Sequence, residues 1–207
     1  MSRVSEKTLS RLPFYLKATE SLKEDGYEYV SASDLATLLS LNEEQVKKDL
    51  QLVCSTSGKP RKGREINTLI RDIQDYLGYK NNTDAIVVGA GHLGQALLNY
   101  KGFSELGINI QAAFDIDKKI VGQAINGKPV FHVDKIKSLV PKLNARIAII
   151  AVPSEAANDI ASKLVDAGIK AIWNFSPIHL NVPNDIIVEY VNLASSLAVL
   201  SAKLREK

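Results

Sequence analysis

Glycines spaced for phosphate binding lie near the middle of the chain. The pattern GxGxxG, directly after the apolar stretch 85–88, consists of Gly89, Ala90, Gly91, His92, Leu93 and Gly94. In a strand–turn–helix unit, the first glycine permits the tight turn and the second lets the backbone approach a pyrophosphate. The third allows the helix to pack closely on the strand. Because free N–H groups at a helix N-terminus attract anions, this pattern predicts the pyrophosphate site of a dinucleotide.

An acidic residue follows at the position that a bound adenosine ribose requires. Asp115 lies 21 residues after Gly94, at the end of the next apolar stretch. A carboxylate there accepts hydrogen bonds from ribose hydroxyls and repels a 2′-phosphate, which favours NAD(H) over NADP(H). Asp117 is included in the predicted site, and the nearby Lys118 and Lys119 weaken the exclusion of NADP(H). The competing interpretation is that the glycines only shape a turn.

Two later apolar stretches end beside the same predicted site. Val152 and Pro153 follow one of them, and Asn174 and Phe175 follow the other. The carboxyl ends of parallel strands share one edge of a sheet, where ligands of open α/β folds bind. Asn174 could hydrogen-bond a nicotinamide amide or equally cap a turn, and Phe175 is predicted to line a dry pocket for the ring.

A second chemical signal is a concentration of positive charge between residues 47 and 64. This segment holds six basic residues against one acid, whereas the whole chain has a net charge of only +3. The residues predicted to contact DNA are Gln45, Lys47 and Lys48 on a helix, and Lys59, Arg61 and Lys62 on a flexible loop tip. Gln suits adenine, and Lys suits guanine or phosphate. The alternative is an ordinary solvated surface.

The elements that must position these residues change in character near residue 80. Before it, apolar residues recur at helical steps in 9–22, where Pro13 predicts a helix start or a kink. A capping box at Ser31 and Asp34 begins a short helix, a turn follows at 41–42, and 43–53 forms the next helix. This outline is typical of a helix-turn-helix.

After residue 83, apolar β-branched stretches alternate with helical patterns. Strands are predicted at 85–88, 108–114, 129–132, 146–152 and 170–175, and helices at 93–100, 134–140 and 155–167. This alternation predicts a parallel sheet with right-handed crossovers. The fold class is therefore α/β, with a winged-helix domain at 1–80, a Rossmann domain at 81–190 and a C-terminal dimerisation helix at 191–207.

Composition excludes several other classes of protein. With Cys54 as the only cysteine, no intrachain disulfide can form. The polar start of the sequence does not resemble a signal peptide, and no run of about 18 apolar residues predicts a membrane span. A cytoplasmic location is expected. No cluster of Cys, His and carboxylates has metal-ligand spacing, so no metal site is predicted.

The motifs taken together resemble the Rex family of redox-sensing transcriptional repressors. The resemblance spans nearly the whole chain and begins at Arg11-Leu-Pro13. It is carried by the runs Asn42–Leu50 (NEEQVKKDL), Gly89–Gly94 (GAGHLG), Ala96–Phe103 (ALLNYKGF), Ala113–Asp117 (AFDID), Val152–Ala157 (VPSEAA) and Gly168–Pro177 (GIKAIWNFSP). It implies a homodimer that binds operator DNA and releases it when the NADH/NAD⁺ ratio rises, with the last helix packed into the partner subunit.

The resemblance also assigns individual positions and exposes departures. Tyr100 matches a tyrosine near the nicotinamide pocket and is a switch candidate, with ordinary packing at a helix end as the alternative. Lys17 and Asn192 stand where the family often has Arg and Asp in an interdomain contact, and a Lys/Asn pair is weaker than an Arg–carboxylate fork. The segment 51–63 lacks the family's aromatic stretch but keeps glycines and basic residues.

Two other functions fit parts of the pattern. An NAD-dependent dehydrogenase could use His92, His132 or His179 as an acid–base group, but the chain has little length for a substrate domain. A nucleotide-binding protein, for example one that binds coenzyme A, could instead use its basic helices to contact another protein. We predict a DNA-binding regulator with no catalytic residue.

Overall fold

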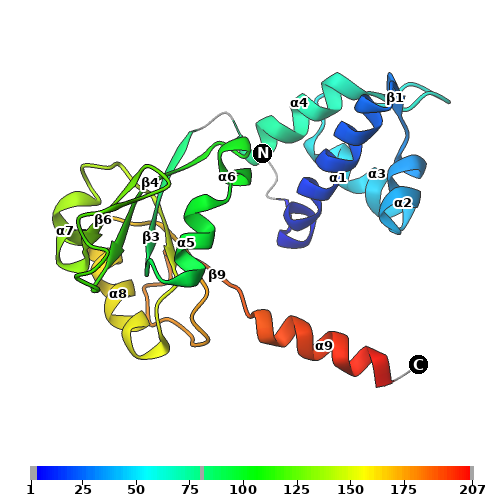
Figure 1. Ribbon diagram of the computed structural model, residues 1–207. Helices are drawn as coiled ribbons and strands as arrows, with labels where there is room; N and C mark the ends of the chain where they lie inside the picture. Colours follow the sequence, from blue (N-terminus) through cyan, green and yellow to red (C-terminus); the bar gives the residue numbers. More distant parts are fainter. Residues whose placement is uncertain (1–3, 80–81, 206–207) are drawn as a thin grey trace. The chain divides into compact units, whose positions relative to one another are not determined.

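The chain divides into two compact units, Met1–Asn81 and Asn82–Lys207. A computed structural model describes residues 4–79 and 82–205 (Figure 1). Each unit has its own buried core, and each is described below by itself.

The first unit is a helical domain with a small antiparallel ribbon. Its elements are α1 (Glu6–Glu24), β1 (Tyr29–Val30), α2 (Ala32–Leu39), α3 (Glu43–Val53), β2 (Arg64–Glu65) and α4 (Ile66–Leu77). Leu12 and Tyr15 of α1 are buried together with Leu35, Val46 and Ile73 from the other three helices. The β1–β2 ribbon pairs Tyr29 with Glu65 and Val30 with Arg64, so the segment between α3 and β2 forms a wing.

Local sequence signals set the starts of the two helix-turn-helix elements. The predicted capping box is confirmed: Ser31 accepts the backbone N–H of Asp34, and Asp34 accepts the backbone N–H of Ser31. Asn42 caps α3 by accepting the N–H groups of Glu44 and Gln45. The turn between α2 and α3 begins at Ser40, which adopts the left-handed conformation.

Of the two possibilities that Pro13 left open, a helix start or a kink, the helix start is wrong. The helix starts at Glu6, capped by Ser5, and continues through Pro13. Proline in a helix interior removes one backbone hydrogen bond. The neighbouring Leu12, Tyr15 and Leu16 are buried in the domain core, and their packing offsets this loss.

The second unit contains a seven-stranded sheet in the order β5-β6-β4-β3-β7-β8-β9. Its strands are β3 (Thr83–Val88), β4 (Ile108–Asp115), β5 (Ala124–Ile125), β6 (Lys128–His132), β7 (Ile147–Ile150), β8 (Ala171–Asn174) and β9 (Ile187–Tyr190). All neighbours pair in parallel except β5 with β6. The six parallel strands have the Rossmann order, with its switch point between β3 and β7.

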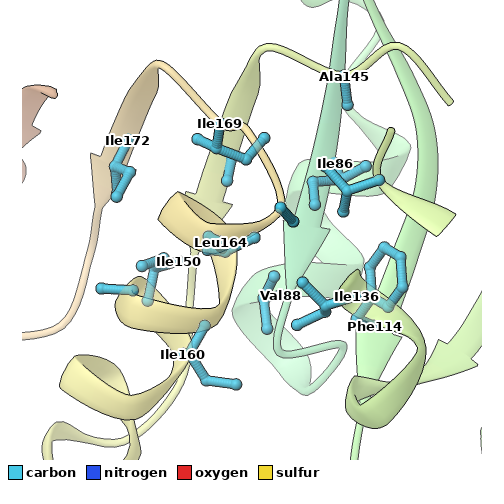
Figure 2. Packing of buried hydrophobic residues seen from close by; sticks show 14 of the residues in the cluster. Ile86, Val88, Phe114, Ile136, Ala145, Ile150, Ile160, Leu164, Ile169 and Ile172 are labelled. Atoms are coloured by element: carbon cyan, nitrogen blue, oxygen red, sulfur yellow. The ribbon is translucent and has the colours of Figure 1, made fainter. Parts of the chain in front are cut away.

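Helices cover the two faces of this sheet unequally. They are α5 (His92–Asn99), α6 (Gly102–Glu105), η1 (Val133–Lys135), α7 (Ile136–Leu139) and α8 (Ser154–Asp166). One face packs Ile86, Val88 and Phe114 against Ile136 of α7 and Leu164 of α8 (Figure 2). The alternate residues on the other face pack with α5, so the strand periodicity assigns each side chain to one of two cores.

The predicted strands and helices are all present, with ends shifted by a few residues. The predicted helix 134–140 is instead η1 followed by the single turn of α7. The elements α6, β5 and β9 of this unit were not predicted. In the first unit, α4 was also missed, although its buried residues Ile66, Leu69 and Ile73 recur at helical steps. A last helix, α9 (Leu193–Arg205), has no buried residue in the single chain.

Candidate dinucleotide site and nucleic-acid interface

The GxGxxG motif between β3 and the first turn of α5 needs two of its glycines for the fold itself. Gly89 has a φ of +94°, and a Cβ there would overlap the carbonyl oxygen of Ala151, which follows β7. A Cβ on Gly94 would overlap the carbonyl oxygen of Gly89. These contacts bring the loop against the switch point of the sheet and bring α5 against the loop.

The middle glycine meets a different requirement. Gly91 is the N-cap of α5, with an ordinary φ of −68°, and a Cβ added to it would meet no heavy atom within 4 Å. Packing of the chain therefore does not demand glycine at this position. Open space in front of the helix N-terminus is what the close approach of a phosphate requires, so the loop fits a pyrophosphate.

Asp115 lies next to this loop. Its Oδ2 accepts the backbone N–H of Ala90 over 2.5 Å, and its Oδ1 accepts the N–H of Asp117 over 2.9 Å. The carboxylate is half-buried at the end of β4, and each oxygen retains a further lone pair for a ligand. The predicted acid and the glycine loop are thus in direct contact.

A second side chain supports the loop and was missed by the sequence analysis. The Nε2 of Gln95, in the first turn of α5, donates to the carbonyl oxygen of Ala90 over 3.0 Å. Ala90 is therefore held through its N–H by Asp115 and through its carbonyl by Gln95. The signal was available, since a glutamine one residue after GxGxxG can reach back over the first helical turn.

The remaining predicted cofactor residues have varied surroundings. His92 and Leu93 begin α5 and are exposed. Asp117 is exposed and its Oδ1 accepts the N–H of Lys119, so this carboxylate caps the turn after β4. Val152 and Pro153 follow β7, and Pro153 is the N-cap of α8.

Asn174 uses its amide inside the protein. It is buried, its Nδ2 donates to the carbonyl oxygens of Ser176 and Ile178, and its Oδ1 accepts the N–H of Ser176. Of the two roles that the sequence left open, this arrangement is the turn cap. Ser176 in turn donates its hydroxyl to the carbonyl oxygen of Val152 over 2.6 Å, which joins the ends of β7 and β8.

Aromatic rings form a continuous edge-to-face series beside these strand ends. Phe175 contacts Trp173 at 4.5 Å between centroids, Trp173 contacts Phe103 at 5.9 Å, and Phe103 contacts Tyr100 at 5.0 Å. Tyr100 ends α5, lies over Gly102, and is 61 % exposed. The series links the predicted nicotinamide-side residue Phe175 to the switch candidate.

The face of α3 that carries the predicted DNA contacts is exposed. Gln45, Lys47 and Lys48 are all exposed, whereas Val46 and Leu50 are buried. Lys47 forms ion pairs with Glu43 and Glu44, each at 2.9 Å, which raise the pKa of its ammonium group to about 12. Lys47 is therefore partly neutralised by its own helix.

The wing folds back on itself as a hairpin, and its tip carries the basic residues expected from the sequence. Lys59 and Gly63 exchange backbone hydrogen bonds of 2.6 and 3.0 Å, and Arg61 has a φ of +62° at the turn. A Cβ on Gly63 would overlap the carbonyl oxygen of Val30. Lys59 and Lys62 place their ammonium groups 5.3 and 5.5 Å from the ring centre of Tyr29, which orients the charge of the tip.

One acid within the basic segment does not lower the surface charge. Asp49 of α3 is only 1 % exposed and accepts hydrogen bonds from Arg11, Tyr15, Thr8 and Gln45. Burial alone would raise the pKa of its carboxyl group, but the bonds from Arg11, Tyr15 and Thr8 outweigh burial and hold it below the usual value. The group ties α3 to α1.

The histidines considered for acid–base chemistry are not brought together. His132 pairs with Asp134 at 3.0 Å, His179 packs against Tyr190 with its ring tilted, and His92 begins α5. Within residues 4–79 and 82–205, no group of three or more His, Cys, Asp or Glu side chains could hold a metal ion. Over the same residues, no helix is both long and apolar enough to span a membrane.

Comparison with known proteins covers both units. A family model described as "CoA binding domain" matches residues 80–178, and one described as "Putative DNA-binding protein N-terminus" matches residues 3–51. The crystal structure of RSP, a Rex-family repressor, in complex with β-NAD⁺ and operator DNA is 33% identical to this chain. It matches with a TM-score of 0.93 over 100% of this chain and 94% of that one.

Curated relatives agree over almost the full length. The redox-sensing transcriptional repressor Rex of Treponema denticola is 42% identical over 97% of this chain and 95% of its own length. The Rex protein of Bacteroides fragilis is 39% identical over 98% of this chain and 92% of its own length. These relatives are transcriptional repressors and not enzymes. The chain belongs to the Rex family of redox-sensing transcriptional repressors.

Proposed function

We propose that this protein is a cytoplasmic repressor that binds operator DNA as a homodimer and releases it when the NADH/NAD⁺ ratio rises. The observation that carries the proposal is the coexistence, in one chain, of the Asp115–Ala90 dinucleotide loop and an exposed basic helix and wing. The matching RSP structure, whose ligands are NAD⁺ and operator DNA, supports it.

The DNA contacts come from two places in the first unit. The start of α3, with Gln45 and Lys48, enters the major groove in the manner of a recognition helix. The wing tip, with Lys59, Arg61 and Lys62, contacts phosphates or the adjacent minor groove. The hairpin supports this arrangement, because it brings these three basic residues together at one tip.

The coenzyme contacts come from the second unit. The N–H groups at the start of α5 receive the pyrophosphate beside Gly91, and Asp115 accepts hydrogen bonds from the ribose hydroxyls. When bound, the coenzyme supplies a nicotinamide ring that is positively charged when oxidised and neutral when reduced. The apolar series from Phe175 to Tyr100 favours the neutral ring, because burial of a charge without a partner is costly.

The homodimer follows from apolar surface that the single chain leaves uncovered. Leu193, Leu197, Leu200 and Leu204 of α9 are each more than half exposed. On the sheet face opposite α8, an apolar groove of about 330 Å³ crosses β7, β8 and β9, lined by residues that include Phe103, Trp173 and Ile187. Exposed apolar areas of this kind mark protein interfaces, and the α9 helix of a second copy has the chemistry to cover the groove.

The redox response needs two arrangements of the dimer. Two recognition helices match their half-sites in one arrangement and not in the other. NADH shifts the population only if it binds the second arrangement more tightly than NAD⁺ does. Tyr100, Lys17 and Asn192 are the residues through which we expect the second unit to influence the first.

The test is an operator-binding titration at fixed salt with NAD⁺, NADH and no coenzyme. The proposal predicts tight binding without NADH and a loss of affinity with NADH. Equal DNA affinity under all three conditions would reject redox control, and absence of sequence-specific binding would reject the repressor assignment.

The match to a CoA-binding family model raises coenzyme A as a second ligand. Its adenosine carries a 3′-phosphate on the ribose, next to where the Asp115 carboxylate would lie. Repulsion between the negative 3′-phosphate and the negative carboxylate disfavours binding of coenzyme A. Calorimetry with NADH, NAD⁺, NADPH and coenzyme A is expected to give the tightest binding for NADH.

A further inference from the structure

We propose that Gln45 specifies an adenine in each operator half-site and that the buried Asp49 is its positioning residue, which orients the Gln45 amide before DNA arrives. The inference rests on the DNA-binding function proposed above. It deepens that function by assigning one base position to one side chain.

The geometry begins with a buried carboxylate that accepts several hydrogen bonds. The Oδ2 of Asp49 accepts from Arg11 Nε at 2.7 Å and from the Tyr15 hydroxyl at 2.7 Å. Its Oδ1 accepts from Arg11 Nη2 at 3.0 Å and from the Thr8 hydroxyl at 3.0 Å. These donors all belong to α1, and Tyr15 is itself fully buried. The orientation of the Asp49 carboxylate is therefore set by hydrogen bonds from three residues of α1.

Gln45 lies one helical turn before Asp49 and contacts the same carboxylate. Its Nε2 donates to Asp49 Oδ1 over 3.1 Å. A glutamine amide has a donor end and an acceptor end that can exchange by rotation about its last side-chain bond, whereas an ionised carboxylate only accepts. Because the hydrogen bonds from Arg11, Tyr15 and Thr8 keep the pKa of Asp49 low, the donor end of Gln45 must face Asp49.

What remains of the amide matches one base. Oε1 and the second hydrogen on Nε2 are left for a ligand. In the major groove, adenine presents the N7 acceptor beside the N6 donor, and glutamine pairs with both. With its amide held before binding, Gln45 loses little conformational freedom when it reads the base.

Lys47, on the same helix, is held differently. It is paired with Glu43 and Glu44, and its ammonium group is a donor only. It can approach guanine or phosphate but cannot accept from the N6 donor of adenine. Within the described start of α3, the amide of Gln45 is thus the group suited to adenine.

The test uses the full-length protein and a randomised duplex library to define the preferred half-site. Each position of that half-site is then substituted, and the affinity ratio is measured for wild type, Gln45→Ala and Gln45→Glu. We expect wild type to prefer adenine at one position on the order of tenfold, as for a bidentate pair, and Gln45→Ala to lose that preference alone. Gln45→Glu, which accepts but does not donate, should shift the preference towards cytosine.

Two further variants separate orientation from folding. Asp49→Asn, checked for its fold by circular dichroism, should relax the adenine preference at that position. Tyr15→Phe also removes a bond to Asp49, but from Oδ2 and not from the oxygen that holds Gln45. Tyr15→Phe should lower stability and leave the base preference unchanged. If Asp49 had a purely structural role, both variants would instead show the same base preference.

The outcomes also distinguish this inference from the function on which it rests. If wild type selects no sequence from the library, the DNA-binding function itself fails. If wild type selects a site and Gln45→Ala weakens every substituted site by the same factor, Gln45 contacts phosphate and the inference is wrong. An unchanged adenine preference in Gln45→Ala would overturn it as well.

Discussion

The backbone N–H of Ala90 donates to the carboxylate of Asp115 over 2.5 Å, across 25 residues of sequence. This bond joins the loop after β3 to the end of β4. At these two places the protein would contact the phosphates and the ribose of a dinucleotide. The loop is therefore held in shape by the same group that we expect to bind the ribose.

We predict that Asp115→Asn lowers NADH affinity at least tenfold. An amide cannot accept from both the loop and the ribose as a carboxylate does, and bonds to a charged acceptor contribute about 1.5–3 kcal/mol. Discrimination against NADPH should fall as well, since the repulsion of the 2′-phosphate is lost. Calorimetry with both coenzymes measures the two effects, and NADH binding that matches wild type would contradict the role of Asp115.

Alanine at two glycines of the same motif should have opposite effects. Gly91→Ala places a Cβ in open space at an ordinary φ, so thermal stability should stay within about 1 kcal/mol while NADH affinity is lost. Gly94→Ala forces a Cβ into the carbonyl of Gly89 and should destabilise the second unit by about 1–3 kcal/mol or more. Thermal unfolding and coenzyme titration of each variant test the contrast, which fails if both variants lose stability equally.

Asp49 should stabilise the first unit above acidic pH. Its folded-state pKa is lowered, so its contribution is complete above the unfolded value of about 4 and is lost as the pH falls through the folded-state pKa. Asp49→Asn breaks a largely buried ion pair and should cost about 3 kcal/mol near pH 7. Urea unfolding at pH 7 and in acid should show the difference from wild type shrinking below pH 4; a constant difference would refute this linkage.

The wing should strengthen DNA binding through its positive charge without discriminating between DNA sequences. Removal of one phosphate contact lowers the slope of log affinity against log salt by about 0.9 for duplex DNA. Arg61→Ala and Lys62→Ala should each show this decrease and weaken binding to all sequences alike. Lys142→Ala, which removes an exposed lysine of the second unit, is the matched control. A base-specific loss in the wing variants would mean that the tip reads sequence.

A charge within the leucine stripe of α9 should prevent dimer formation. Leu197→Glu places a carboxylate where we expect apolar contact, and burial of an unpaired charge is strongly unfavourable. Analytical ultracentrifugation should show monomers, and operator affinity should fall with the loss of paired half-site contacts. Ser195→Glu adds the same charge elsewhere on the helix and should remain dimeric. A dimeric Leu197→Glu protein would exclude α9 from the interface.

The sequence by itself determined the architecture and the location of the coenzyme loop. The spacing of apolar residues distinguishes helices from strands, because the side chains on one face recur at a different interval in each structure. For this reason β3, β4 and α8 could be placed from local residues. The glycine pattern was equally local, because a positive φ at Gly89 and a close contact at Gly94 each demand the absence of a Cβ. The capping box of Ser31 and Asp34 could also be predicted, because the two residues are only three positions apart in the sequence.

Only the tertiary structure decided how several polar side chains are used. Asn174 was equally suited to a ligand or a turn, and it became a turn cap because Ser176 and Ile178 fold back around it. Asp49 could be counted from the sequence as a surface charge, but packing of α1 against α3 surrounds it with donors 34 to 41 residues away. Hydrogen bonds between distant segments depend on how whole elements pack, and no local period encodes that packing.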